Sequence, residues 1–175
     1  NNMIYIVRHG QTDYNVNGRY GGRIDVPLNE KGISDAKKLK DKFKGIKFDY
    51  IFCSPLTRTV QTLKEITDQD FIVDERIIER SNGALEGKLK NEITEEIDFN
   101  DPNEKRYDIE NIIDFRNRIE NFLNEIDTKY KGKNILIVTH AGVCIYIRCH
   151  YEGEPKNNDY YSYKIGNCDV LTYKN

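Results

Sequence analysis

The sequence lacks two features that would each point to a particular class of protein. No apolar run approaches the about 20 residues that a helix needs to cross a bilayer. The 27 basic and 29 acidic residues are interspersed along the chain, without a long block of either sign that could form a stripe for nucleic acid. We therefore expect neither a membrane nor a nucleic acid as a partner.

The cysteines also lack a recognisable spacing. No C-x-x-C pair occurs among the four cysteines, which lie in apolar surroundings at Cys53, Cys144, Cys149 and Cys168. They are expected to be reduced and mostly packed thiols, which favours a cytoplasmic protein.

The composition that is present is typical of a globular protein. Apolar residues make up 38% of the chain and charged residues 32%, which is too apolar for a disordered protein. A length of 175 residues suits one domain that can bury a full core and a recessed site. We expect a single domain over residues 1–175, without internal repeats.

Strand and helix patterns alternate along the chain. Short apolar runs predict buried strands at residues 4–7, 50–53, 71–73 and 135–138. Apolar residues at intervals of three and four predict helices at residues 29–43, 54–66 and 112–126, and a further helix is expected at 141–151. This alternation predicts a three-layer α/β/α sandwich with a mostly parallel central sheet.

Local sequence features also predict where two of the helices begin and which segments lack a regular pattern. Asn29 is expected to cap the first helix, and Ser54 and Pro55 are expected to supply the cap and the first turn of the second. Residues 77–107 show no sustained period and are expected to be irregular, as functional loops often are. The Tyr-rich segment 160–173 is expected to form edge strands.

Three of the predicted strands end in residues that can bind an anion. Arg8 and His9 follow the first strand, Ser54 and Arg58 follow the second, and His140 follows the strand at 135–138. Because ligands of open α/β sheets bind at the carboxyl ends of the strands, these side chains are expected to meet. Clustered arginines and imidazoles repel one another unless an anion is present, and phosphate suits the planar fork of arginine. The N-terminus of the helix after the second strand would add free N–H groups.

Each of these residues taken alone has a simpler explanation. A histidine after a strand is more often structural than catalytic, and an arginine in a first helical turn is usually solvated. The chain has only three histidines, however, and two of them fall at the predicted ligand edge. The joint pattern therefore favours a functional site.

The segments around these positions resemble the signature of the histidine phosphatase superfamily, in its phosphoglycerate-mutase-like branch. The resemblance extends over nearly the whole chain, and the matching segments stand in the family's order: RHGQT at 8–12 with Asn15, GRYGG at 18–22, DVPL at 25–28, SPLTR at 54–58, ER at 79–80 with GALEG at 83–87, and THAG at 139–142.

The resemblance implies a covalent mechanism that needs no cofactor and no metal. His9 would attack phosphorus to give a phosphohistidine, and Glu79 would protonate the leaving alkoxide and later activate water. The equatorial phosphoryl oxygens would be held by Arg8, Asn15, Arg58 and His140.

The chain also departs from the phosphoglycerate mutases. Those enzymes carry an insertion with paired arginines that hold the substrate carboxylate, and residues 88–139 contain no such pair, which favours hydrolysis over return of the phosphoryl group. Arg80 and Lys90 nevertheless match substrate positions of the mutases. Gly21 and Gly22 suggest a roomy or mobile rim that contacts the substrate.

The sequence therefore favours a phosphomonoester hydrolase that acts on a small phosphorylated metabolite. Mutase-type phosphoryl transfer is one alternative. A metal-dependent hydrolase with His9, His140 and Glu79 as ligands is another, although the two arginines would oppose a divalent ion. A non-catalytic module that binds a phospholigand is the third, and it would need neither a nucleophile nor an acid.

Overall fold

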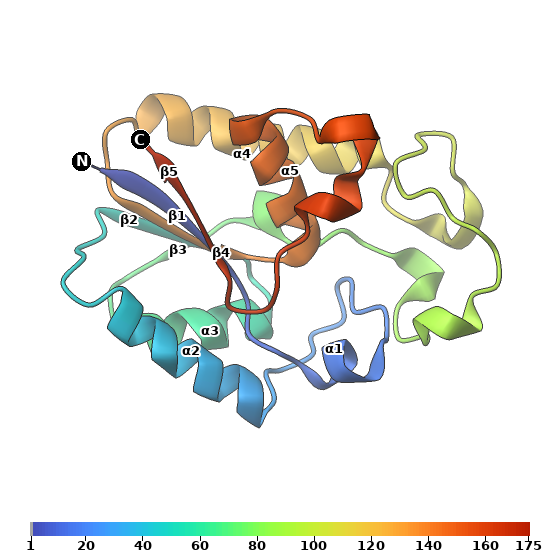
Figure 1. Cartoon of the computed structure of the whole chain (residues 1–175), viewed down its shortest axis with the longest axis horizontal. Helices are drawn as coiled ribbons and strands as arrows, with labels where there is room; N and C mark the ends of the chain where they lie inside the picture. The colour runs from blue at the N-terminus through green and yellow to red at the C-terminus, as the bar shows by residue number, and fades with distance from the viewer. Residues whose placement is uncertain (1) are drawn as a thin grey trace.

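One five-stranded sheet runs through the centre of the protein, of which this computed structural model describes residues 2–175 (Figure 1). The strands follow the order β3-β2-β4-β1-β5 across the sheet. Their bounds are β1 Met3–Arg8, β2 Tyr50–Cys53, β3 Ile72–Val73, β4 Ile135–Thr139 and β5 Val170–Lys174. The α-helices are α1 Asp13–Asn17, α2 Glu30–Lys42, α3 Thr57–Ile66, α4 Ile112–Lys129 and α5 Ala141–Glu152.

The sheet is parallel except at one edge. Strands β1, β4, β2 and β3 pair in parallel, whereas β5 runs antiparallel along β1. Every residue of β4 is buried, as expected for a central parallel strand that is covered on both faces. Helices α4 and α5 cover one face and α2 and α3 cover the other, which confirms the predicted three-layer sandwich (Figure 1).

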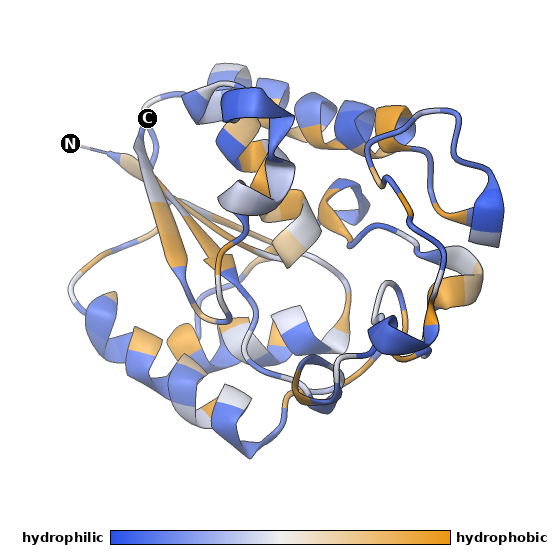
Figure 2. Cartoon of the chain, turned by 45° about the vertical axis from the view of Figure 1, so that its right-hand side comes forward, coloured by the Kyte–Doolittle hydropathy of each residue, from blue (hydrophilic) through white to orange (hydrophobic). Residues whose placement is uncertain are grey.

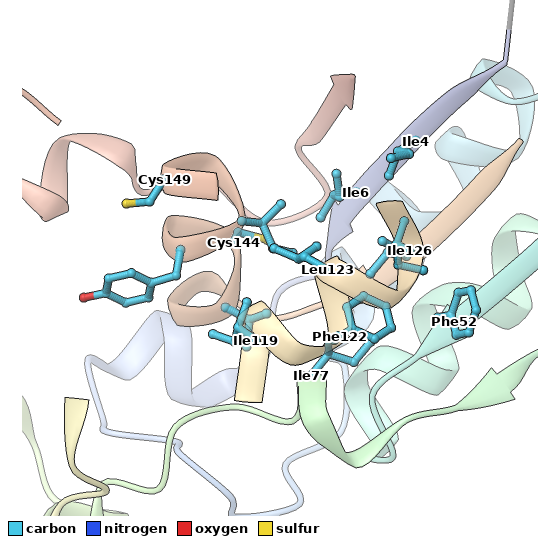
Figure 3. Close-up of a cluster of buried hydrophobic side chains, with 14 of the residues drawn as sticks. Ile4, Ile6, Phe52, Ile77, Ile119, Phe122, Leu123, Ile126, Cys144 and Cys149 are labelled. Carbon is cyan, nitrogen blue, oxygen red and sulfur yellow. The ribbon is translucent and has the colours of Figure 1, made fainter. Parts of the chain in front are cut away.

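Two hydrophobic cores lie on the two faces of this sheet. Side chains of a strand alternate between faces, so Ile4 and Ile6 of β1 join the core under α4 and α5, and Val7 joins the core over α2 and α3. Figure 3 shows Ile4, Ile6 and Phe122 within the first core. The hydrophobic positions follow the strands and the inner sides of the helices (Figure 2).

The predicted start of helix α3 is wrong. The helix begins at Thr57, and neither Ser54 nor Pro55 belongs to it. Its first N–H group is not free but donates to Asp25 Oδ1 at 2.7 Å, and the Thr57 hydroxyl donates to Asp25 Oδ2 at 2.8 Å. A carboxylate from a distant loop caps this helix in place of a local serine, because the dipole at a helix N-terminus favours a negative charge.

The prediction of edge strands over the Tyr-rich segment holds only for β5. Residues 160–163 form a 3-10 turn instead. The rings of Tyr160 and Tyr163 are three positions apart, so this turn directs both against the core beside α5, where they are partly buried. Packing of these rings on the core replaces sheet pairing.

The segment between β3 and α4 is irregular, as the sequence predicts. It contains only short 3-10 turns, at residues 75–77, 83–85, 90–92 and 106–108. In Figure 1 it runs in green and yellow around the side of the sheet that carries the strand ends. None of the helices within residues 2–175 is long and apolar enough to cross a membrane.

A histidine on α5 is held between two carboxylates of α4. His150 Nδ1 lies 2.8 Å from Glu120 Oε2, and its Nε2 lies 2.6 Å from Asp127 Oδ2. Burial lowers the pKa of His150, but the hydrogen bonds to Asp127 and Glu120 outweigh it, so the pKa is raised above its ordinary value. Both ring nitrogens can donate only in the imidazolium form. The protonated ring therefore joins the two helices.

This arrangement predicts that stability depends on the protonation of His150. Because the folded-state pKa is raised, the contribution is complete below the unfolded pKa of about 6.5 and is lost as the pH rises through the folded value. In urea unfolding, the free energy of unfolding of wild type should exceed that of His150→Gln by about 1 kcal/mol at about pH 6, and this difference should shrink at about pH 9. An equal difference at both pH values would contradict this account.

Candidate active site

Three neighbouring parallel strands end at one edge of the sheet and bring the expected side chains together. Arg8 is the last residue of β1, His9 follows it, and His140 follows β4 as the N-cap of α5. The His9 N–H donates to the Thr139 carbonyl at 3.0 Å, which ties the two strand ends. The rings of the two histidines have centroids 5.3 Å apart.

A small pocket of about 130 Å³ opens at this edge. It is lined by most of the residues that the sequence singles out, namely Arg8, His9, Asn15, Gly21, Gly22, Arg58 and Glu79. His140 is fully buried behind it and does not line the pocket. The structure adds residues that the sequence analysis did not single out for the site, namely Thr12, Tyr14, Arg19, Tyr20, Asn82 and Lys164.

His9 is held as a neutral imidazole with one nitrogen free. Its Nδ1 lies 2.7 Å from the Gly10 carbonyl oxygen, which can only accept, so Nδ1 carries the proton and Nε2 keeps its lone pair. Burial and the positive charges of Arg58 and Arg8 lower its pKa to about 3. The ring is only 4% exposed. Near neutral pH this ring can therefore act as a nucleophile without first losing a proton.

The loop at Gly10 depends on close packing. A Cβ at Gly10 would lie 2.7 Å from the carbonyl oxygen of Gly32 in α2, so a larger residue has no room. The Gly10 N–H donates to Thr62 Oγ1 at 3.0 Å. Helices α2 and α3 therefore fix the backbone that orients the imidazole.

His140 is fully buried and is oriented by a serine. Its Nε2 lies 2.7 Å from Ser54 Oγ, which also accepts from the Leu56 N–H at 3.4 Å. The serine hydroxyl can donate to Nε2, and the other ring nitrogen, Nδ1, has no hydrogen-bond partner among residues 2–175. Burial and the charge of Arg58 lower the pKa of His140 well below its ordinary value. A neutral ring with one unpartnered nitrogen thus lies beside His9.

Two guanidinium groups complete the site without carboxylate partners. Arg8 Nη1 donates to the Ile165 carbonyl at 2.6 Å. Arg58 Nη1 and Nη2 donate to the carbonyls of Ile24 and Gly22 at 2.7 and 2.6 Å. No carboxylate within residues 2–175 forms a salt bridge with either arginine, although both are buried.

The two glycines at the rim differ in their surroundings. The nearest atom to a Cβ at Gly21 would be Arg58 Nη2 at 4.0 Å, so there is room beside it. Gly22 has a φ of 53°, and a Cβ there would lie 2.2 Å from Glu86 Oε2. Glu86 also accepts from the Asn82 N–H at 2.9 Å. The rim is thus roomy at Gly21 and tightly packed at Gly22.

Glu79 faces the pocket with both carboxylate oxygens held by backbone. Oε1 accepts from the Arg80 N–H at 2.8 Å, and Oε2 accepts from the Gly142 N–H at 3.1 Å in the first turn of α5. A Cβ at Gly142 would lie 2.5 Å from Oε1, so only glycine permits this approach. The carboxylate is therefore fixed beside the phosphate-sized pocket.

Asn15 presents an amide donor. Its Oδ1 accepts from the Thr12 N–H at 3.0 Å in a capping box that begins α1. This contact sets the orientation of the amide, and its Nδ2 is left for a ligand of the pocket that Asn15 lines.

Arg80 does not line this pocket. Its guanidinium donates to the carbonyls of Glu110 and Phe99 at 2.9 and 2.7 Å, and it borders a second, adjoining cavity. Lys90 and Lys164 line the phosphate-sized pocket instead. Partial burial lowers the pKa of both lysines, although much of each side chain remains in solvent. Lys164 could not be found from a strand pattern, because its segment is a turn.

Comparison with known proteins agrees with this geometry. The model of the histidine phosphatase superfamily (branch 1) matches residues 4–174. Phosphoserine phosphatase 1 of Hydrogenobacter thermophilus is 31% identical over 148 residues, which cover 79% of this chain and 70% of that protein. The adenosylcobalamin/alpha-ribazole phosphatase of Salmonella typhimurium is 31% identical over 154 residues, or 80% of this chain and 74% of that protein.

Other relatives and solved structures widen the comparison. A 2,3-bisphosphoglycerate-dependent phosphoglycerate mutase of Lactiplantibacillus plantarum is 41% identical, but only over 100 residues, 53% of this chain and 44% of the mutase. The structure of Bacillus stearothermophilus YhfR superposes with a TM-score of 0.84 and 27% identity, and covers 98% of this chain and 90% of its own. Since the family model spans nearly the whole chain and the fold agrees, this protein belongs to the histidine phosphatase superfamily, branch 1.

Proposed function

We propose that this protein hydrolyses phosphomonoesters of small metabolites through a phosphohistidine at His9. The observation that carries the proposal is a neutral, buried imidazole beside two buried guanidinium groups that have only carbonyl partners. Such a site is short of negative charge, and a phosphate dianion supplies it. The names of the phosphatase relatives support the same reaction class.

Binding would use the donors that the protein leaves free. Arg8, Arg58 and the Nδ2 of Asn15 would contact the phosphoryl oxygens. His140 would join them through its unpartnered Nδ1, in the tautomer that carries the ring proton there. These donors are fixed before the substrate arrives, so little reorganisation is needed when charge moves during the reaction. The pocket of about 130 Å³ suits a phosphoryl group and not the whole substrate.

The reaction would then proceed in two displacements. His9 Nε2 attacks phosphorus, the P–O bond to the alcohol breaks, and the carboxyl group of Glu79 gives its proton to the alcohol oxygen. In the second step Glu79 takes a proton from water, whose oxygen attacks phosphorus while the P–N bond breaks. Inorganic phosphate leaves, and His9 and Glu79 return to their starting states.

Hydrolysis is favoured over mutase-type transfer by the shortness of the segment between Gly87 and His140. This segment contains no paired arginines that could hold a substrate carboxylate while the phosphoryl group returns. The mutase relative also matches over less than half of its own length. Water therefore has better access to the phosphohistidine than a retained alcohol has.

Hydrolysis of p-nitrophenyl phosphate should survive excess chelator. The two guanidinium groups already supply the positive charge that a divalent metal would bring. Initial rates measured with and without EDTA test this expectation. Complete loss of activity that a divalent metal restores would reject the mechanism.

Arg58→Ala should lower kcat/KM by roughly 100-fold or more, about 3 kcal/mol, because a charged donor to the phosphoryl group is lost. Lys64→Ala is the matched control, since Lys64 lies exposed on the same helix α3. Steady-state kinetics should separate the two variants, with the control close to wild type. An Arg58 variant as active as its control would remove Arg58 from the site.

The roles of His9 and Glu79 can be separated by leaving group. His9→Ala should abolish turnover of every phosphomonoester, because the covalent route is lost. Glu79→Gln should damage alkyl phosphates much more than p-nitrophenyl phosphate, whose phenolate hardly needs a proton. The informative quantity is the loss in kcat/KM of Glu79→Gln on alkyl phosphates divided by its loss on p-nitrophenyl phosphate. Equal losses on both would assign Glu79 an orienting role.

The same glutamine variant should accumulate the covalent intermediate, because it cannot activate water. Mass spectrometry at mildly basic pH, where phosphohistidine survives, should find phosphate on the peptide that contains His9. Phosphate on the peptide that contains His140 would reverse the roles of the two histidines.

A further inference from the structure

A second cavity adjoins the small pocket that is lined by Arg8, His9 and Arg58, which we call the phosphate pocket, on the side of Glu79. Its volume is about 460 Å³, against about 130 Å³ for the phosphate pocket. The two cavities share Glu79, Asn82, Ala141 and Lys164. Because Glu79 is the proposed proton donor to the leaving oxygen, the alcohol part of the substrate is expected to extend into this second cavity.

The second cavity is walled by aromatic rings, namely Phe99, Phe115, Tyr146, Tyr160 and Tyr161. Neighbouring rings pack on one another, with centroid distances of 5.6 Å from Phe115 to Tyr146 and 5.7 Å from Tyr146 to Tyr160. Phe115 and Tyr146 are only 1% and 5% exposed, so they support the wall from behind. The ring surface open to a flat apolar group comes from Phe99 and Tyr160, which are half-buried, and from the exposed Tyr161. A cavity of this size and lining is typical of a small-molecule site.

Arg80 lies against two rings of this wall. Its guanidinium carbon lies 5.9 Å from the Phe99 ring centroid and 5.7 Å from that of Phe115. Its hydrogen bonds to the carbonyls of Glu110 and Phe99 hold it in this place. The charge of Arg80 thus lies against two aromatic rings at the border of the cavity.

Polar groups also line this cavity. The Tyr146 hydroxyl donates to Asn100 Oδ1, which leaves the Asn100 amide N–H groups available. The carboxylates of Asp98 and Asp159 also line the cavity and can accept from N–H donors. Donors and acceptors beside aromatic walls suit a heteroaromatic ring.

We propose that the substrates are phosphomonoesters of alcohols that carry a heteroaromatic ring of nucleobase size. This inference rests on the phosphatase function proposed above. The phosphoryl group occupies the small pocket, and the ring lies in the second cavity against the aromatic wall. A three-carbon alcohol such as glycerate would leave most of the second cavity without contacts, so the structure favours the larger leaving group.

The test compares two substrates that share one leaving oxygen. Adenosine 5′-monophosphate and methyl β-ribofuranoside 5-phosphate differ only in the group at the anomeric carbon. The wild-type protein should hydrolyse the nucleotide with a kcat/KM at least about tenfold higher, the gain expected when one base stacks on aromatic side chains. Equal values, or a preference for 3-phosphoglycerate over the nucleotide, would overturn the inference.

Two variants test whether the gain arises in this cavity. Tyr161→Ala removes a ring that is 74% exposed and so should not affect folding. Phe99→Leu replaces a half-buried ring with an apolar side chain of similar volume. Either variant should lower severalfold the ratio of kcat/KM for the nucleotide to kcat/KM for the methyl riboside phosphate. The control Tyr50→Ala should keep the wild-type ratio, because Tyr50 lies at the start of β2, away from the strand ends that carry the site. Unchanged ratios in both cavity variants would overturn the inference.

Activity on p-nitrophenyl phosphate distinguishes failure of the proposed function from failure of the proposed substrate class. If this ester is hydrolysed but neither ribose ester is, the phosphatase function stands and the proposed substrate class is wrong. If no ester is hydrolysed, the proposed function itself fails.

Discussion

The site depends on holding two arginines together in a buried place without acidic partners. Removing each cation from water costs several kcal/mol unless it is compensated, and the two also repel each other. The protein meets this cost with backbone carbonyls, which orient Arg8 and Arg58 but leave their net charge in place. Pairing with carboxylates would have stabilised the free protein and blocked the phosphate. The irregular loops around the edge of the sheet supply these carbonyls.

The loop at residues 18–28 illustrates this dependence. It supplies the carbonyls of Gly22 and Ile24 that hold Arg58, and the Asp25 carboxylate that caps the helix on which Arg58 lies. One loop therefore fixes both ends of the same arginine. The packing of Gly22 against Glu86 in turn ties this loop to the segment that carries Glu79. Arg58 and the segment of Glu79 are thus connected through this one loop.

Much of the fold and part of the site follow from local patterns in the sequence. The strands at β1, β2 and β4 are short apolar runs, and the rule that ligands bind at parallel strand ends brings His9, His140 and Arg58 together. The start of α3 could not be predicted, because its cap is Asp25, which is distant in the sequence. The turn at 160–163 depends on tertiary packing of tyrosines, and Lys164 follows it into the pocket. Glu79 lies in an irregular segment and was indicated only by the family resemblance.

Strand β5 and the turn before it have a consequence for how the protein is made. The Ile165 carbonyl holds Arg8, the Asn167 amide donates to the His9 carbonyl at 3.1 Å, and the Cys168 N–H donates to the Arg8 carbonyl at 2.9 Å. A ribosome has synthesised His9 long before these partners emerge. The nascent chain therefore carries His9 on a strand end that lacks these contacts until residues 165–168 have been synthesised. The edge of the pocket at Arg8 and His9 is complete only after this segment has folded back onto β1.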